Sequence, residues 1–127
     1  MSERIVFITT NQIGDGALEK VKEAARKSTD FLEANGPQLM AEVFIDESEL
    51  RLIGMQVHRD SESILTHWQI SDPYMRDVMQ YTTATRVDIY GQPSEAVMAG
   101  MRRLASQGAV IAVTPRFAGF GRFPASE

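Results

Sequence analysis

The sequence predicts one α+β domain over residues 1–127, with a ferredoxin-like βαββαβ order followed by an added C-terminal helix and strand. Helix and strand patterns follow one another in that order along the chain. The length of 127 residues is typical of a single domain, and no linker, internal repeat or low-complexity tract divides it. An apolar fraction of 43% and a charged fraction of 24% are those of a chain that builds one hydrophobic core.

The first half of the chain predicts a strand, a helix and a hairpin. Residues 4–10 are β-branched and aromatic, as in a buried strand. A helix over residues 17–34 carries an apolar stripe and ends at residues 35–37, Asn-Gly-Pro. Residues 38–46 and 50–58 then read as two strands, and the short polar link between them predicts a hairpin.

The next segment predicts a helix with an interruption. Asp60 or Ser61 can cap a helix that carries Trp68, because a side-chain oxygen there accepts from free backbone N–H groups. The run Ser-Asp-Pro at residues 71–73 predicts a break, after which Asp72 caps a second, short helix that begins at the proline.

The last third predicts the fourth strand and the added elements. Residues 84–90 alternate cleanly between apolar and polar side chains, as in a strand. A helix begins near residues 92–95 and ends at Gly108, and residues 109–114 form a final strand. Residues 118–123 are a glycine- and aromatic-rich tail.

Composition excludes several classes of function. The net charge of −4 is spread along the chain without a basic cluster, so nucleic-acid binding is not expected. The absence of cysteine excludes disulfides, thiolate metal sites and a cysteine nucleophile. No long apolar run could span a bilayer and the first residues lack a secretory pattern, so we expect a soluble, cytoplasmic protein without membrane contact.

Alternation along the strands sorts their side chains into two sets. One set is uniformly apolar and is expected beneath the helices: Val6, Ile8, Ala41, Val43, Ile45, Ile53, Met55, Val57, Val87 and Ile89. The other set mixes aromatic with polar side chains: Phe7, Thr9, Asn11, Met40, Glu42, Phe44, Leu52, Gly54, Gln56, His58, Arg86, Asp88 and Tyr90.

The mixed set is too apolar for a bare surface, which predicts a homodimer. Two sheets that pair face to face across a two-fold axis would cover it and would leave a lined cavity in each half. The alternative is that the C-terminal strand and tail of the same chain fold back over that face.

Several segments together resemble a known group. They are the hairpin from Gly36 to His58, the helix start at residues 60–63 with His67 inside the helix, the run at residues 88–95, and Gly-Phe-Gly-Arg at residues 119–122. Over residues 4–123 the chain resembles the dimeric α/β-barrel superfamily, and it is most similar to uncharacterised proteins grouped with antibiotic-biosynthesis monooxygenases.

The resemblance implies an activity and a set of substrate contacts. Monooxygenases of the group oxidise quinols or anthrone-like compounds with dioxygen, without metal or flavin, so no cofactor is expected. An Asn on the first strand and a Trp and a Tyr on the middle helix face the substrate there, which suggests Asn11, Trp68 and Tyr74. Haem-degrading relatives have a haem-ligating His about ten residues after the Trp, where this chain has Asp77 and Val78.

Two histidines are the candidate catalytic residues. An imidazole titrates near pH 6.5, so His58, at the end of a strand, could act as a general base or could instead bond the cap of the following helix. His67 beside Trp68 could enter the cavity or pack at its rim. Two histidines without a third spaced ligand do not predict a metal site.

The remaining candidates are substrate-binding residues of the mixed set. Glu42, Phe44, Gln56 and Asp88 lie among aromatic side chains, where a polar group needs a partner. Asp88 could instead form an interface ion pair with Arg86. The sequence thus leaves two functions open: a cofactor-independent oxidation of a small aromatic or apolar molecule, or a non-catalytic ligand-binding or structural homodimer.

Overall fold

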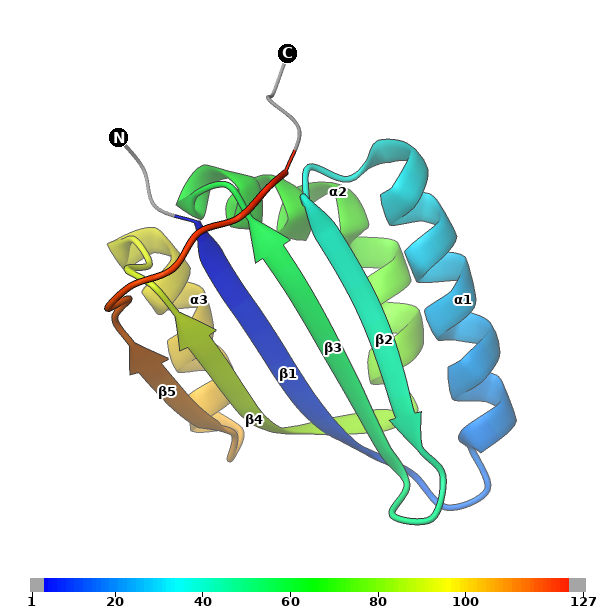
Figure 1. Cartoon of the computed structure of the whole chain (residues 1–127). Helices are drawn as coiled ribbons and strands as arrows, with labels where there is room; N and C mark the ends of the chain where they lie inside the picture. Colours follow the sequence, from blue (N-terminus) through cyan, green and yellow to red (C-terminus); the bar gives the residue numbers. More distant parts are fainter. Residues whose placement is uncertain (1–3, 124–127) are drawn as a thin grey trace.

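The computed structural model describes residues 4–123 and contains the predicted strands and helices, with one helix where the sequence predicts two (Figure 1). In chain order these are β1 (Ile5–Ile13), α1 (Leu18–Asn35), β2 (Met40–Asp46), β3 (Arg51–His58), α2 (Ser61–Met79), β4 (Thr82–Tyr90), α3 (Glu95–Ser106) and β5 (Val110–Thr114). The ferredoxin-like α+β prediction is confirmed. None of the helices among residues 4–123 is long and apolar enough to cross a membrane.

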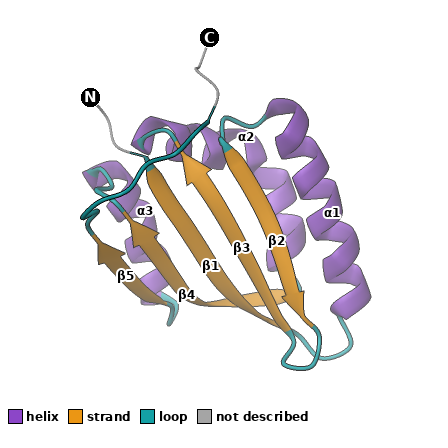
Figure 2. Ribbon diagram, in the orientation of Figure 1, coloured by secondary structure: helices purple, strands orange, loops and turns teal. Residues whose placement is uncertain are grey.

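The strands form one sheet in the order β2-β3-β1-β4-β5. The first four strands pair antiparallel, and β5 adds to β4 in parallel after the crossover through α3. All three helices lie on one face of the sheet, and the opposite face has no helix over it (Figures 1 and 2). We call these the helix-covered face and the open face.

Helix α2 is continuous, so the predicted break at residues 71–73 is wrong. Proline removes one backbone N–H, whose helical acceptor would be the carbonyl of Gln69. Pro73 and Gln69 are both exposed, so water can solvate that carbonyl at little cost. Asp72 does not cap a new helix but pairs with Arg76 one turn later, with 2.8 Å between Oδ2 and Nε.

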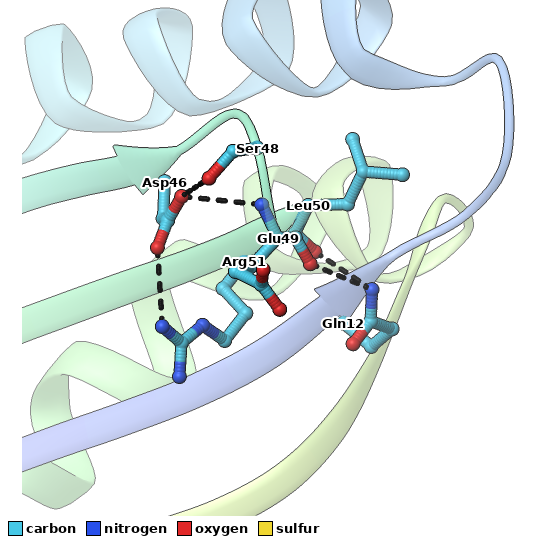
Figure 3. A network of polar contacts seen from close by, with 6 residues as sticks. All are labelled: Gln12, Asp46, Ser48, Glu49, Leu50 and Arg51. Carbon is cyan, nitrogen blue, oxygen red and sulfur yellow. Dashed lines mark hydrogen bonds and ion pairs between the residues drawn. The ribbon is translucent and has the colours of Figure 1, made fainter.

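The β2–β3 hairpin is confirmed and is held by polar contacts at its turn (Figure 3). The Asp46 carboxylate accepts from the Ser48 hydroxyl at 2.8 Å and from the Glu49 backbone N–H at 3.2 Å. Its second oxygen pairs with Arg51 at 3.1 Å. These bonds, led by the one from Ser48, lower the pKa of Asp46.

Strand register corrects the predicted division of side chains between the two faces. Residues directly opposite each other on neighbouring strands share a face. Phe7 lies opposite Gln56 of β3 and opposite Ile89 of β4, and both Phe7 and Ile89 are buried beneath the helices. The predicted faces are therefore right for β2 and β4 and wrong for β1 and β3.

The corrected faces follow from the pairing. The helix-covered face carries Ile5, Phe7, Thr9, Asn11, Ile13, Ala41, Val43, Ile45, Leu52, Gly54, Gln56, His58, Val87 and Ile89. The open face carries Val6, Ile8, Thr10, Met40, Glu42, Phe44, Ile53, Met55, Val57, Arg86, Asp88 and Tyr90. Polar side chains thus occur on both faces, and the helix-covered one buries several of them.

A β-bulge shapes one end of the helix-covered face. Thr10 lies opposite Arg86 but the next residue, Asn11, lies opposite Ala84, so Thr85 is an extra residue on β4. The Thr85 hydroxyl donates to the backbone oxygen of Thr10 at 3.1 Å. Strand β4 bends along its length (Figure 1), and residues 82–84 line the space beneath the helices.

The C-terminal tail runs back along the end of the sheet where β1 begins (Figure 1). The Arg4 guanidinium lies 5.4 Å from the centroid of the Phe123 ring. Phe44 and Tyr90 on the open face nevertheless remain 50% and 42% exposed. The tail therefore leaves much of the open face uncovered.

Candidate functional site

A cavity of about 460 Å³ lies between the sheet and the helices. It separates two groups of buried side chains, one around Phe7 and Ile64 and the other around Val21 and Leu52. Its walls are largely apolar, with Trp68 of α2 among them. Its size suits a small organic molecule.

His58 is fixed at one end of the cavity by two short hydrogen bonds. The side chain is 1% exposed, because β3 ends beneath the first turn of α2. Nδ1 lies 2.7 Å from the Ser63 hydroxyl, and Nε2 lies 2.8 Å from Oε1 of Gln56. Asp60 caps α2 by accepting from the Ser63 N–H at 3.0 Å, which holds Ser63 in place.

His67 lies in the same cavity, on the α2 face that contacts the sheet. It is 7% exposed, and its ring centroid is 5.9 Å from that of His58. Nδ1 lies 2.9 Å from the Ser71 hydroxyl, one turn further along the helix. Nε2 has a longer contact of 3.4 Å with Nε2 of Gln56. Both predicted catalytic histidines are therefore in the cavity lining and linked through one amide.

Burial sets the protonation state of both histidines. The pKa of His58 falls from 6.5 to about 4, mainly because of desolvation and also because of the neighbouring His67, while Asp60 partly opposes the shift. Desolvation alone lowers the pKa of His67 to about 4. Both imidazoles are neutral at pH 7, so each has one N–H donor and one acceptor nitrogen.

Asn11 and Trp68 also line the cavity, as the resemblance implies. Asn11 donates from its amide to the backbone oxygen of Leu52 at 3.4 Å. The Trp68 ring packs against Gly100 of α3, where an added Cβ would lie 2.5 Å from ring atom Cζ3. The helix added after the ferredoxin-like core therefore holds the position of Trp68.

The other predicted site residues are more dispersed. Glu42 borders the cavity from edge strand β2, although its pairing with Met55 puts its side chain on the open face. Phe44 and Asp88 lie on the open face, where Asp88 pairs with Arg86 at 2.9 Å. Tyr74 stacks on Phe31 of α1 with ring centroids 4.4 Å apart, outside the cavity.

Three further residues of the site, Ser63, Ser71 and Gln38, were not predicted from the sequence. The two serines each bond a histidine, and Gln38 donates to Oε1 of Gln56 at 3.2 Å. The spacing of Ser63, His67 and Ser71, four residues apart, puts all three on one helix face and could have revealed the serines. Gln38 precedes β2 in a loop and carries no comparable periodic signal.

The charge of the cavity limits what it can bind. Of the side chains that line it among residues 4–123, none is Lys or Arg. No group of three potential metal ligands occurs in this described part of the chain. An anionic ligand such as a phosphate ester would therefore have no cationic partner in the lining, whereas an uncharged, hydroxylated ring would find acceptors and donors.

Comparison with solved structures identifies the fold. MupZ from Pseudomonas fluorescens matches with a TM-score of 0.74 and 14% identity, covering 95% of this chain and 96% of MupZ. SnoaB from Streptomyces nogalater, a cofactor-independent oxygenase, matches at 0.61 and 8% identity, over 73% of this chain and 96% of SnoaB. A candidate antibiotic biosynthesis monooxygenase from Nitrosomonas europaea matches at 0.63 and 14% identity, over 72% and 92% of the two chains.

Sequence comparison adds no closer relative. No protein-family model matches the sequence, and no curated protein matches it. The resemblance to the antibiotic-biosynthesis-monooxygenase-like group is confirmed as a shared ferredoxin-like fold. The match to MupZ extends over nearly the whole chain and so includes the added α3 and β5.

Proposed function

We propose, from this shared fold and from the chemistry of the cavity, that the chain oxidises a small hydroxylated aromatic molecule with dioxygen and without a cofactor. The observation that carries the proposal is a neutral imidazole nitrogen, Nε2 of His67, in a largely apolar cavity of about 460 Å³. It is a proton acceptor placed where water is scarce. The fold shared with SnoaB, a cofactor-independent oxygenase, supports the same chemistry.

The reaction needs no external electron donor. A proton leaves the substrate to His67, and the resulting carbanion or oxyanion gives electrons to dioxygen. For a phenol with a free ring C–H ortho or para to its hydroxyl, or for its CH2 keto tautomer, one oxygen atom ends in the new C=O of a quinone. The other oxygen atom leaves as water with the two hydrogens lost from the substrate, so substrate and dioxygen balance without a reductant. The chain's part is to orient the ring against Trp68 and to accept the first proton.

The acidity of the substrate decides whether that proton moves. A simple phenol has a pKa near 10, about six units above that of His67 at about 4, so transfer costs about 8 kcal/mol. Attraction between the new anion and the imidazolium lowers this cost by about 4 kcal/mol at about 4 Å. A hydroxyl or CH conjugated to a carbonyl has a pKa several units lower, which removes most of the remaining cost of the transfer. We therefore propose a carbonyl-conjugated quinol or phenol as substrate rather than an isolated phenol.

Oxygen uptake tests this proposal directly. Purified protein is incubated with quinols and anthrones, and the initial rate of oxygen consumption is compared with His67→Gln, His58→Ala and Trp68→Ala variants. We expect the rate to fall at least tenfold in the His67 variant and to stay unchanged when the exposed Gln92 is changed to Ala. Equal rates in all variants and in buffer would refute the oxidation.

A non-catalytic ligand-binding role is the second candidate. It is favoured by the low pKa of His67, because the nitrogen can accept a hydrogen bond from a ligand without taking its proton. Isothermal titration with the same compounds separates the two functions: saturable binding without oxygen uptake supports storage or transport of the ligand.

We also propose that two copies pair through the open face. The face exposes large apolar side chains, with Phe44 at 50% and Tyr90 at 42% exposure, beside Ile53 and Met55. The Arg86–Asp88 pair at its other side adds one charge of each sign, so this ion pair contributes no net charge to a two-fold interface.

Sedimentation velocity tests the pairing. We expect a dimer at micromolar concentration, and a monomer after Phe44→Glu, since a charge on each copy would be buried at the interface. A Gln92→Glu variant, which adds the same charge outside the open face, should remain dimeric. A monomeric parent protein at these concentrations would refute the pairing.

A further inference from the structure

We infer that Gln56 is a positioning residue: its amide holds the two histidines in opposite tautomers, so that His67, and not His58, presents a free Nε2 lone pair to the cavity. This role rests on the proposed function and extends it by naming the residue that leaves Nε2 of His67, rather than a nitrogen of His58, able to receive the proton. It depends on the direction of five hydrogen bonds that join Gln38 and Gln56 to the histidines and their serines.

The first half of the chain of bonds fixes His58. Oε1 of Gln56 is an acceptor, and two nitrogens point to it: Nε2 of Gln38 at 3.2 Å and Nε2 of His58 at 2.8 Å. His58 must therefore carry its proton on Nε2. Its Nδ1 is then the acceptor for the Ser63 hydroxyl at 2.7 Å. Both nitrogens of His58 are engaged in short bonds, and neither is free for a ligand.

The second half fixes His67 in the opposite tautomer. The Gln56 amide nitrogen is a donor, so the nitrogen of His67 that faces it at 3.4 Å, Nε2, must be the acceptor. His67 then carries its proton on Nδ1 and donates it to the Ser71 hydroxyl oxygen at 2.9 Å. One amide, with an acceptor at one end and a donor at the other, thus imposes different proton positions on two neighbouring rings.

The distances show which nitrogen a ligand can reach. The contact between Gln56 and Nε2 of His67 is at the outer limit of a hydrogen bond, whereas the other histidine bonds are between 2.7 and 2.9 Å. A ligand hydroxyl can replace this weak contact by donating to His67, and its oxygen can accept from the freed N–H of Gln56. His67 and Gln56 together therefore recognise an O–H group, and not an ether oxygen, which has no proton to donate.

Proton transfer then follows one route. The ligand O–H bond breaks, an N–H bond forms on Nε2 of His67, and the ring becomes an imidazolium whose Nδ1–H already points at Ser71. The ligand oxyanion keeps the Gln56 N–H as a donor. Two charged or titratable groups act on the pKa of His58: Asp60, which raises it, and His67, which lowers it.

The tautomers can be measured without any ligand. In uniformly ¹⁵N-labelled full-length protein at pH 7, long-range ¹H–¹⁵N correlation spectra distinguish the protonated nitrogen of each imidazole by its chemical shift. We expect His58 to be protonated at Nε2 and His67 at Nδ1. Two histidines in the same tautomer, or the opposite assignment, would overturn the inference whatever activity the protein has.

The Gln56→Glu variant reverses the direction of the hydrogen bond to His67 with little change of shape. A carboxylate accepts at both ends, so His67 should move its proton to Nε2 and lose the free lone pair. We expect 4-nitrophenol, whose neutral and ionised forms absorb at different wavelengths, to bind at least tenfold more weakly to this variant. Gln69→Glu, on the exposed side of α2, adds the same charge and should bind like the parent.

These readouts separate the inference from the proposed function. The expected tautomers together with no oxygen uptake would leave the assignment of Gln56 intact and refute the oxidation. An unchanged His67 tautomer and unchanged nitrophenol affinity in the folded Gln56→Glu variant would refute the positioning role, even if the parent protein consumed oxygen.

Discussion

The two faces of this sheet both depart from the usual distribution of side chains. The helix-covered face, which is normally the drier one, places the partly buried Gln56 and Asn11 and the fully buried His58 around a cavity. The open face, which would normally be polar, carries Ile8, Met55 and Phe44. Both exceptions need an explanation, because buried polar groups cost free energy unless they are bonded and exposed apolar groups favour association.

The two exceptions have different physical consequences. On the helix-covered face a chain of hydrogen bonds joins the polar groups, which limits their cost; it leaves one weakly bonded nitrogen on His67 and the buried Oε1 of Gln38 without a partner. On the open face Phe44 and Tyr90 remain about half exposed. The first face is therefore the candidate for chemistry, and the second is the candidate for contact with another copy.

The largest expected effect is a loss of stability in acid that comes from the helix-covered face. His58 and His67 have a pKa of about 4 when folded and of 6.5 ordinarily, so between these values the unfolded chain binds more protons. Their contribution to the free energy of unfolding is complete above pH 6.5, falls as the pH drops towards 4, and is constant below that. The limit is about 3 kcal/mol per histidine.

Urea unfolding at fixed protein concentration across pH 7 to 4 measures this loss. His67→Gln should remove about half of the dependence on pH that lies between 6.5 and 4, because one titrating group is gone. A slope in that window identical for the parent and for His67→Gln would contradict the assignment of a buried, neutral His67.

The next effect compares two isoleucines on opposite faces of the sheet. Ile89 is fully buried with Phe7 and Ile64, so Ile89→Ala should cost about 3 kcal/mol of unfolding free energy through lost contacts and a new cavity. Ile53 lies on the open face, and Ile53→Ala should cost less than about 1 kcal/mol at concentrations where the chain is monomeric. Urea unfolding at low and high protein concentration checks both. Equal losses at low concentration would mean that the open face is covered within one chain.

The sequence predicts the elements of this fold well and the sidedness of its sheet poorly. Turn and cap signals predict where most elements begin and end because they are local, as with Asp60 at the start of α2, although residues 71–73 predicted a break that is absent. Strands β1 and β3 are central and carry apolar side chains at both parities, for example Ile5 beside Val6. Alternation then separates two sets without saying which set the helices cover, and only pairing across strands, such as Phe7 with Gln56, decides it.

The site shows the same division between local and non-local information. His67, Trp68 and Asn11 could be predicted by residue type and position, and the structure places all three at one cavity. The partners of the histidines could not all be predicted, since Gln38 reaches Gln56 from a loop eighteen residues earlier. Tyr74 contacts Phe31 instead of the cavity because α2 continues through Pro73 and carries the tyrosine towards α1.

A smaller effect tests how α3 supports the cavity wall. Helix propensity alone predicts that Gly100→Ala stabilises the protein by about 1 kcal/mol. An added Cβ would lie 2.5 and 2.8 Å from two atoms of the Trp68 ring, so we expect a net loss of about 1 kcal/mol and a shifted fluorescence maximum of this single tryptophan. Ala99→Gly, at an exposed neighbouring position, should lower stability by a similar amount without moving the fluorescence. A gain in stability at position 100 would show that the ring is free to move.

The smallest effect comes from the polar network of the hairpin, which makes bonds like those of the histidine chain but in contact with water. Asp46 accepts from Ser48, from the Glu49 N–H and from Arg51, and replacing it with Ala exchanges these bonds for bonds to solvent. Amide exchange followed by NMR should show faster exchange at Glu49 with an unchanged unfolding midpoint. Ser48→Ala, which removes a single bond, should speed exchange less. If Asp46→Ala instead lowered the midpoint as much as removing a buried histidine, burial would not be what distinguishes the two networks, and the contrast between exposed and helix-covered polar groups would fail.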